Sequence, residues 1–370
     1  MKHLSAFIIL LTICFFSQTT IAQEKIEIGT KHRLFSKKMN EEKDYWVYLP
    51  PSYNDTIYAP QKYPVVYFLD GSRHFHSITG IHDFLIKGPY GSLPEMIMVG
   101  VISKDRAKDY TPTKVNKPNS GLKNFPTSGD NSKFLNFIES ELKPTINKKY
   151  RTSEFSIFIG HSFGGIAVLN ALLEKPELFD AYISIDPSIW WDNAYFLKKG
   201  EEKFTKRQFN KKSLYLARAD NLIQPKNNYT KLNKKNVAKH LEKIEKFHSL
   251  LKEASDLKLR WAFNFFKNED HGTVSLPAEF KGLRFIFENY QAPIKSVAQN
   301  PEILASQFKT LSKKIGTQMK PSEARVDWIA NYCIKRKLKK SAIKLLKMNV
   351  KWYPNSTHAK LALDKVLQSK

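Results

Sequence analysis

The segment FSIFIGHSFGG, residues 155–165, decides the fold of this chain. It begins as a short apolar run typical of a buried strand, and residues 164–174 then carry apolar side chains at helical spacing. Ser162 lies between them in a Gly-x-Ser-x-Gly turn. Because Gly160 and Gly164 have no Cβ, the backbone can turn sharply enough to hold the Ser162 hydroxyl exposed above the sheet. The order strand, turn and helix therefore predicts a nucleophile elbow with Ser162 as the catalytic nucleophile.

Outward from this segment, short β-rich runs alternate with amphipathic helical stretches between about residues 24 and 290. This alternation predicts an α/β fold in which helices cover both faces of a mostly parallel sheet. Several runs are apolar throughout, as expected of strands that are buried on both faces. The predicted strands are residues 45–49, 64–69, 96–102, 155–159, 181–185, 213–217 and 259–266, and the predicted helices are residues 132–148, 164–174 and 236–254. Residues 103–131 read as a long surface loop.

The composition excludes several classes of protein. Of the 370 residues, 42% are hydrophobic and 13% aromatic, so the chain can bury a large core and lacks the signature of disorder. Its length fits one large domain with an appendage. Because Cys14 lies in a segment that we expect to be removed, Cys333 alone supports neither a disulfide framework nor a cysteine-based zinc site. The net charge of +25 favours anionic partners or serves only solubility.

Residues 1–22 are predicted to be a signal peptide. Lys2 precedes an apolar run over residues 4–16, and the Thr-Ile-Ala sequence at 20–22 has the pattern that a signal peptidase accepts. We therefore expect cleavage after about Ala22 and a periplasmic or secreted protein. A membrane anchor is the competing interpretation, but the run is shorter than the roughly 20 apolar residues that a bilayer requires. The sequence thus predicts no stable membrane span.

Residues 293–370 are predicted to form a basic, all-helical C-terminal region. Residues 301–370 hold 16 Lys and Arg against 4 Asp and Glu. Within them, the spacing of Ala330, Ala342 and Pro354 resembles one tetratricopeptide repeat, with an ordinary amphipathic hairpin as the alternative. One repeat cannot bury its own apolar face, so we expect these helices to dock on the main domain. A protein partner for them stays open.

A serine hydroxyl is a weak nucleophile and needs a base. In this kind of fold the order along the chain is serine, acid and histidine, so the base follows a late strand. His271 does so directly after the strand at 259–266, whereas His240 and His248 lie in a Lys-rich amphipathic helix. Asp220, at the end of the strand at 213–217, is the predicted acid, with a turn-capping role as the alternative. Its rivals are Asp192 and Glu269.

Charge that develops on the substrate oxygen needs fixed N–H donors. One is the amide of Phe163, directly after the nucleophile. The second is expected in the loop after the strand at 64–69, and Ser72 is our choice for this oxyanion hole. Arg73 in the same loop is predicted to hold an anionic or polar substrate group, and a salt bridge that only shapes the loop is the alternative.

With these residues assembled, the chain resembles the putative-esterase family of the α/β-hydrolases, which includes siderophore trilactone esterases, S-formylglutathione hydrolase, feruloyl and acetylxylan esterases and the mycolyltransferases. The similarity spans roughly residues 30–290. Its motifs are LDG at 69–71, VGV at 99–101 with Arg106 in the following loop, PSIWWD at 187–192 and EDHG at 269–272. The resemblance implies an α/β-hydrolase domain at residues 23–292 and a carboxylic ester hydrolase. The chain departs from the family at 218–221, where RADN stands in place of the acid turn of many members.

The residues and the resemblance predict an exported serine esterase that forms an acyl-enzyme on Ser162 with His271 as general base. The expected substrate is a siderophore or carbohydrate ester. Trp190 and Trp191 are predicted to wall its pocket and Arg106 to attract an anionic ester, with core packing of both tryptophans as the alternative. An acyltransferase of the same fold, or a non-catalytic protein that binds through the C-terminal hairpin, is the alternative function.

No cofactor, metal or nucleic acid is expected. His74 and His76 alternate without an acidic or cysteine partner beside them, and with His82 further on they are more typical of loop residues than of metal ligands. The sequence has no helix-turn-helix, RRM, KH or zinc-finger pattern that would explain its charge by nucleic-acid binding.

Overall fold

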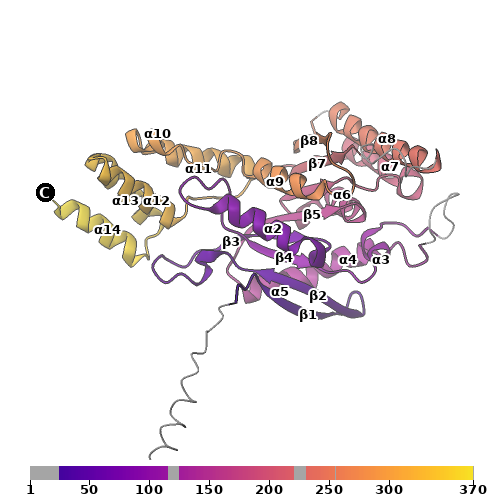
Figure 1. The fold of residues 1–370 in the computed structure, drawn as a ribbon, viewed down its shortest axis with the longest axis horizontal. Helices are drawn as coiled ribbons and strands as arrows, with labels where there is room; N and C mark the ends of the chain where they lie inside the picture. The colour runs from indigo at the N-terminus through magenta and orange to yellow at the C-terminus, as the bar shows by residue number, and fades with distance from the viewer. Residues whose placement is uncertain (1–24, 116–124, 221–230, 255, 370) are drawn as a thin grey trace, which may run out of the picture.

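The computed structural model describes residues 25–115, 125–220, 231–254 and 256–369. The predicted signal peptide lies outside the described residues. The core is an eight-stranded sheet in the order β1-β2-β4-β3-β5-β6-β7-β8 (Figure 1). Its strands are β1 (Thr30–Ser36), β2 (Glu41–Tyr48), β3 (Tyr63–Phe68), β4 (Ile97–Val101), β5 (Thr152–His161), β6 (Ala181–Ile185), β7 (Ser213–Ala219) and β8 (Arg260–Phe266).

The sheet is mostly parallel, as the sequence predicted. β1 pairs with β2 and β2 with β4 in antiparallel register, and every other neighbouring pair is parallel. Side chains along β5 alternate between two apolar clusters: Ile157 and Ile159 join one, and Phe158 joins the other. Because successive residues of a strand point to opposite faces, both faces of the sheet are covered. The predicted fold class is confirmed.

Helices form a layer on each face. The first cluster includes side chains of α2 (Gly71–Ile86) and α9 (Ser275–Ile286). The second includes side chains of α4 (Asn131–Phe137), α6 (Phe163–Glu174), α7 (Trp191–Lys206) and α8 (Lys231–Glu253). The remaining elements of this domain are η1 (Pro51–Asn54), α3 (Arg106–Tyr110), η2 (Ile138–Leu142), α5 (Lys143–Lys149) and η3 (Pro176–Leu178). No helix in the described ranges is long and apolar enough to cross a membrane.

Strand β1 was not predicted from the sequence. It contains Lys31, His32 and Arg33 in succession and lies at the edge of the sheet, where it pairs only with β2 within the described chain. An edge strand of this kind is mostly solvated and has no apolar run to reveal it. Its identity depends on the pairing with β2 and not on its own composition.

The C-terminal helices dock on the main domain, as expected of a unit too small to bury its own apolar face. They are α10 (Ile294–Gln299), α11 (Glu302–Ile315), α12 (Glu323–Lys335), α13 (Lys339–Trp352) and α14 (Thr357–Gln368). Leu304, Phe308 and Val326 continue the apolar cluster under α2 and α9. The Arg325 guanidinium donates to the Gly91 carbonyl at 2.9 Å and to the Tyr290 carbonyl at 3.2 Å.

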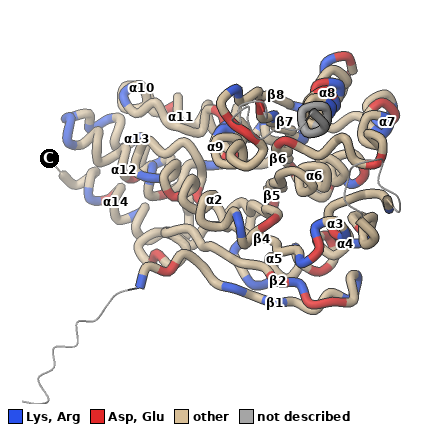
Figure 2. Tube along the Cα trace, turned by 45° about the vertical axis from the view of Figure 1, so that its right-hand side comes forward, with Lys and Arg blue, Asp and Glu red and all other residues tan. Residues whose placement is uncertain are grey.

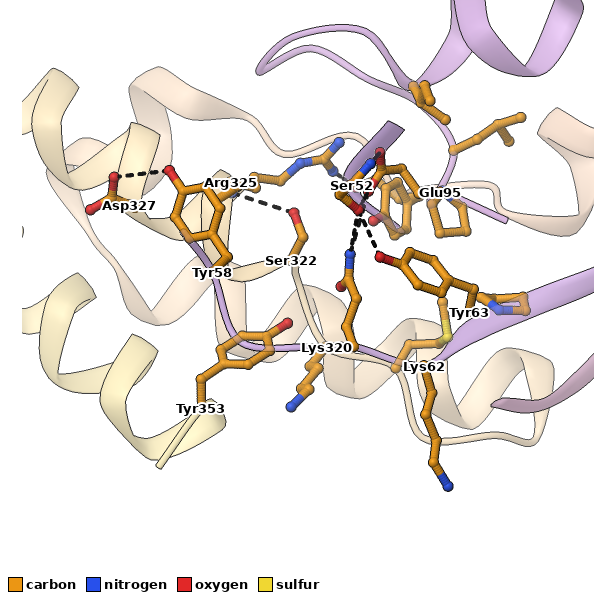
Figure 3. Close-up of a pocket in the computed structure, with 18 of the residues that line it drawn as sticks. Ser52, Tyr58, Lys62, Tyr63, Glu95, Lys320, Ser322, Arg325, Asp327 and Tyr353 are labelled. Atoms are coloured by element: carbon orange, nitrogen blue, oxygen red, sulfur yellow. Dashed lines mark hydrogen bonds between the residues drawn. The ribbon is translucent and has the colours of Figure 1, made fainter. Parts of the chain in front are cut away.

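A pocket of about 740 Å³ lies along this seam (Figure 3). Tyr58, Tyr63 and Glu95 line it from the main domain, and Arg325 and Tyr353 line it from the C-terminal helices. The Tyr58 hydroxyl reaches across to Asp327 of α12. Lys and Arg residues mark α12, α13 and α14 (Figure 2), so much of the net positive charge lies outside the sheet domain.

Candidate active site

The turn after β5 has the geometry of a nucleophile elbow. Ser162 has φ 61° and ψ −116°, a conformation that L-residues seldom adopt, and it is the N-cap residue directly before α6. A Cβ added at Gly160 would overlap the Gly164 backbone, so the turn closes only with glycine there. The Ser162 amide donates to the Ile185 carbonyl at 3.0 Å, which fixes the elbow to the end of β6.

The structure brings His271 to this serine. His271 follows β8, and its Nε2 lies 3.0 Å from the Ser162 Oγ. Its Nδ1 lies 2.6 Å from a carboxylate oxygen, Oδ2 of Asp186. A serine hydroxyl, an imidazole and a carboxylate are therefore connected by two hydrogen bonds in the arrangement that activates a serine for attack on an acyl carbon.

The carboxylate that contacts His271 is Asp186 and not the predicted Asp220. Asp186 directly follows β6, the strand hydrogen-bonded to β5, so its side chain emerges next to the elbow. Asp220 follows β7, one strand further from β5, and donates its amide to the Glu269 carbonyl at 2.9 Å. The acid was predicted at the end of β7, whereas the aspartate that contacts His271 follows β6, the strand that pairs with β5.

Asp186 is fully buried and is held by several donors. The Ala219 amide donates to its Oδ1 at 2.9 Å, and His240 Nε2 lies 3.1 Å from the same Oδ2 that contacts His271. Burial alone would raise the pKa of Asp186, but the hydrogen bonds from His240 and His271 outweigh it and hold that pKa well below its usual value. Asp186 is therefore an anion that accepts hydrogen bonds.

Asp186, His240 and His271 also bring three potential ligand atoms within 4.8 Å of one another, close enough for a metal ion. The hydrogen bonds of 2.6 and 3.1 Å already account for this approach. The arrangement is that of one carboxylate accepting hydrogen bonds from two imidazoles. We therefore assign these residues to the serine site and not to a metal site.

A further histidine contacts His271. His161, in the variable position of the elbow motif, is buried, and its ring centroid is 4.4 Å from that of His271. Burial, followed by the charge of His271, lowers the pKa of His161 well below its ordinary value. His161 is therefore a neutral ring that packs against His271.

Two helix N-termini meet beside Ser162. α2 begins after β3 and α6 begins after β5, and these strands are parallel neighbours, so both helices start at the same edge of the sheet. A Cβ added at Gly164 would lie 3.4 Å from Leu69 and 3.6 Å from an Asp70 oxygen, which shows how closely the two turns approach. The first amides of a helix have no intrahelical acceptor and favour negative charge. Phe163 is the first residue of α6, and Ser72 is the second residue of α2.

The loop before α2 is held by α3. Asp70 has φ 54°, and its carboxylate accepts two hydrogen bonds from Arg106, at 2.7 and 3.0 Å. The Asp70 amide donates to the Tyr110 hydroxyl at 3.3 Å. Arg106, predicted to bind substrate, thus has a structural partner that the sequence did not reveal, although 41% of its side chain stays exposed.

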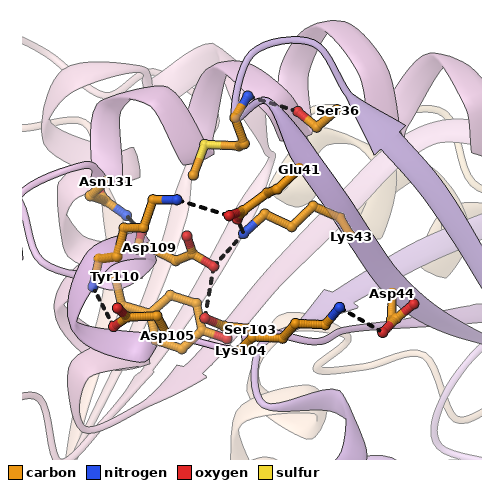
Figure 4. Close-up of polar contacts among 12 residues, drawn as sticks. Ser36, Glu41, Lys43, Asp44, Ser103, Lys104, Asp105, Asp109, Tyr110 and Asn131 are labelled. Carbon is orange, nitrogen blue, oxygen red and sulfur yellow. Dashed lines mark hydrogen bonds and ion pairs between the residues drawn. The ribbon is translucent and has the colours of Figure 1, made fainter. Parts of the chain in front are cut away.

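A buried ion pair in turn anchors α3 (Figure 4). Lys43 of β2 contacts Asp109 at 2.6 Å, and both side chains are almost fully buried. Ser103 donates to the same Asp109 oxygen at 2.7 Å, and Asn131 donates to the Asp109 carbonyl at 2.8 Å. Burial raises the pKa of Asp109, and Lys43 opposes this effect. The pair connects the antiparallel edge of the sheet to the loop beside Ser162.

Aromatic side chains flank the elbow. The Phe163 ring lies 5.5 Å from Phe125 and 6.0 Å from Trp190, and all three rings are half-buried. The Arg106 guanidinium lies 5.8 Å above the Phe163 ring. Trp191, by contrast, is 1% exposed and donates to Thr113. It packs in the core, which was the alternative to its predicted place in the pocket wall.

Arg73, predicted to bind substrate, and the three histidines considered as metal ligands lie on α2. Arg73 is exposed in its first turn. His74 is buried and lies 3.0 Å from Glu279 of α9, whereas His76 is exposed. His82 is fully buried, and its Nε2 accepts the Met96 amide at 3.0 Å.

Comparisons with known proteins agree with this geometry. A family model described as "Putative esterase" matches residues 36–256. The ferri-bacillibactin esterase BesA of Bacillus subtilis is 29% identical over 70% of this chain and 89% of its own length. A siderophore enterobactin esterase of Emericella nidulans is 28% identical over 50% of this chain and 67% of its own. Among solved structures, an IroE-like serine hydrolase from Shewanella oneidensis superposes with a TM-score of 0.78 at 28% identity, covering 88% of this chain and 99% of that one.

Proposed function

Because the chain belongs to the putative-esterase family of the α/β-hydrolase superfamily and is a serine esterase, we propose that it works through an acyl-enzyme on Ser162. The observation that carries the proposal is the unbroken hydrogen-bond chain from Ser162 through His271 to Asp186. Ser162, the first member of this series of hydrogen bonds, lies at an elbow that exposes it between two helix N-termini.

In the acylation step, Ser162 Oγ attacks the ester carbonyl carbon while His271 Nε2 takes the hydroxyl proton. The bond from the carbon to the leaving alkoxy oxygen then breaks, and His271 returns the proton to that oxygen. In the second step water attacks the acyl carbon, His271 takes the water proton, and Ser162 leaves with its proton restored. Asp186 stabilises the imidazolium that forms in each step.

We assign the oxyanion hole to the amide of Phe163 and to an amide at the start of α2, at Ser72 or Gly71 next to it. Both donors belong to helix N-termini, where fixed N–H groups favour the developing negative charge. Arg106 supports this assignment indirectly, because its two hydrogen bonds hold the Asp70 loop against the elbow.

For the substrate we propose a siderophore ester that carries aromatic groups. Two similar proteins are named for esterase activity, one on ferri-bacillibactin and one on the siderophore enterobactin. The half-buried rings of Phe125, Phe163 and Trp190 offer an aromatic wall beside Ser162, and the exposed part of Arg106 offers a cation next to it. A carbohydrate ester is the second substrate class, and it needs the same aromatic wall.

We also propose export to the periplasm or the cell exterior, on the pattern of residues 1–22. The C-terminal helices are proposed to be a tetratricopeptide-like unit with a protein partner. The packing of α12 against α13 and the exposed side chains of Trp328 and Ile334 support that reading.

An ester panel tests the proposal. The purified chain is assayed on 4-nitrophenyl acetate, a ferric catecholate trilactone, and acetylated and feruloylated sugars, with Ser162→Ala as the control. We expect the trilactone to exceed the sugar esters in kcat/KM by about 10²-fold or more, and Ser162→Ala to remove all turnover. A preference for sugar esters would overturn the siderophore assignment, and full activity in Ser162→Ala would overturn the mechanism.

A further inference from the structure

A second histidine contacts the triad acid. His240 lies on α8, and its Nε2 is 3.1 Å from Asp186 Oδ2, the oxygen that His271 Nδ1 contacts at 2.6 Å. The His240 side chain is 11% exposed, and its ring centroid lies 5.7 Å from that of His271. The esterase mechanism described above has no role for it.

The position of His240 on its helix is that of a core residue. Ile244, Phe247 and Leu251 follow it at the spacing of one helix face, and all are buried. An apolar side chain would satisfy this face, so a histidine there introduces a polar group that must find a partner. Its partner is Asp186.

The hydrogen bonds specify which nitrogen carries the proton. Asp186 is an anion, so His240 Nε2 must donate to it. His240 Nδ1 is buried and has no hydrogen-bond partner in the described part of the chain. The hydrogen bond to Asp186 therefore places the donated proton on Nε2.

We infer that His240 is a positioning residue that sets the basicity of His271 through their shared acceptor, Asp186 Oδ2. A carboxylate oxygen has two lone pairs, so Oδ2 accepts both imidazole N–H groups. Each donor stabilises the carboxylate charge. The hydrogen bond from His240 therefore reduces the stabilisation that this carboxylate gives to a protonated His271. With His240 in place, His271 is therefore a weaker base. It stays unprotonated down to a lower pH and can still accept the Ser162 proton there. The inference rests on the proposed function, because it assumes that His271 is the general base.

The same contact fixes the geometry of the acid. Asp186 has φ 39°, and the Ala219 amide holds its Oδ1. His240 holds Oδ2, the oxygen that His271 Nδ1 contacts, so both carboxylate oxygens are fixed by hydrogen bonds. Loss of the donor thus affects both the pH dependence and the orientation of the base.

The test uses two substitutions and a matched control on the same helix. His240→Gln keeps an N–H donor of similar reach, and His240→Leu removes it. His248→Leu is the control, because His248 lies two turns further along α8, next to Glu245 and stacked on Phe263. The remaining titratable and charged groups on the elements around the two rings are unchanged in all three variants: Asp186, His161, Arg106, Arg218, Glu245, Glu269 and Asp270.

The measurement is kcat/KM for 4-nitrophenyl acetate from about pH 5 to pH 9, normalised to the sites titrated by a fluorophosphonate. For His240→Leu we expect the midpoint of the acidic limb to rise by about 0.5 to 1 pH unit, less than the full effect of one hydrogen bond to a charged partner, because Asp186 keeps its charge and its other donors. His240→Gln and His248→Leu are expected to keep the wild-type midpoint. A role in folding alone would lower the number of titrated sites and leave the midpoint unchanged.

An unchanged midpoint in His240→Leu, or equal shifts in His240→Gln and His240→Leu, would overturn the inference. If His240→Leu does not fold, His240→Asn replaces it, because asparagine is too short to reach Asp186 from the same position. Failure of the proposed function has a different signature: the wild-type chain itself would show no fluorophosphonate titre, or Ser162→Ala would stay active.

Discussion

Replacement of Asp186 by asparagine tests the acid of the proposed triad. The carboxylate is fully buried and lies 2.6 Å from His271 Nδ1, so an amide of nearly the same shape removes the charge together with one of the two acceptor oxygens. When His271 takes the Ser162 proton, the imidazolium and the carboxylate are in hydrogen-bond contact, and we take their charge centres to be about 4 Å apart. At an effective dielectric constant of about 20 their attraction is about 4 kcal/mol. The loss of this attraction from the transition state corresponds to a decrease of about 10³-fold in kcat/KM.

The matched control is Asp220→Asn. It removes the same charge from the residue that the sequence favoured, one strand further from the elbow. We expect its kcat/KM to stay within about threefold of wild type, because its contact with the histidine turn is through the backbone amide. The assay is hydrolysis of 4-nitrophenyl acetate at neutral pH, normalised to fluorophosphonate-titrated sites. The opposite pattern, an active Asp186→Asn and an impaired Asp220→Asn, would refute the assignment of the acid.

Three further predictions concern the supports of the site and the pH dependence of stability. Lys43→Met leaves Asp109 buried without its cation, so we expect a loss of about 3 to 5 kcal/mol in the free energy of unfolding by urea; a loss below 1 kcal/mol would contradict the role of the pair. Burial lowers the pKa of His82 to about 4, so the stability from its neutral form is complete above its ordinary value of 6.5 and is lost as pH falls toward 4. His82→Gln should therefore remove about 3 kcal/mol of the difference in unfolding free energy between those two pH values, and an equally steep dependence in the variant would refute it. Gly160→Ala places a Cβ against the Gly164 carbonyl, so we expect the fluorophosphonate reaction to slow by about 10²-fold or more with an intact circular dichroism spectrum, whereas a wild-type rate would show that the turn tolerates a side chain.

Ser162 and His271 could be predicted because each has a local signature. Ser162 lies in a glycine-flanked turn between a strand and a helix, and His271 lies in a polar turn after the last strand. In both cases the chain close to the residue determines where its side chain emerges. The parallel sheet was predictable for the same reason, because buried strands show themselves as continuous apolar runs.

Asp186 could not be predicted in that way, because its role depends on which strand lies next to β5. The sheet order places β6 there, and no periodicity within either strand records that order. The one available signal was a lone acidic residue directly at the end of an apolar strand, Ile185 followed by Asp186. Arg106 is a similar case, because its partner Asp70 is 36 residues away and follows a different strand.

Identification of the labelled residue is the most direct test of the central claim, that Ser162 is the nucleophile of a serine esterase. The wild-type chain, Ser162→Ala and His271→Gln are treated with a fluorophosphonate, and the adduct is located by peptide mass spectrometry. We predict one adduct, on Ser162, no adduct in Ser162→Ala, and labelling slowed by about 10³-fold or more in His271→Gln. Esterase activity together with an adduct on another residue, or with no adduct at all, would contradict the account.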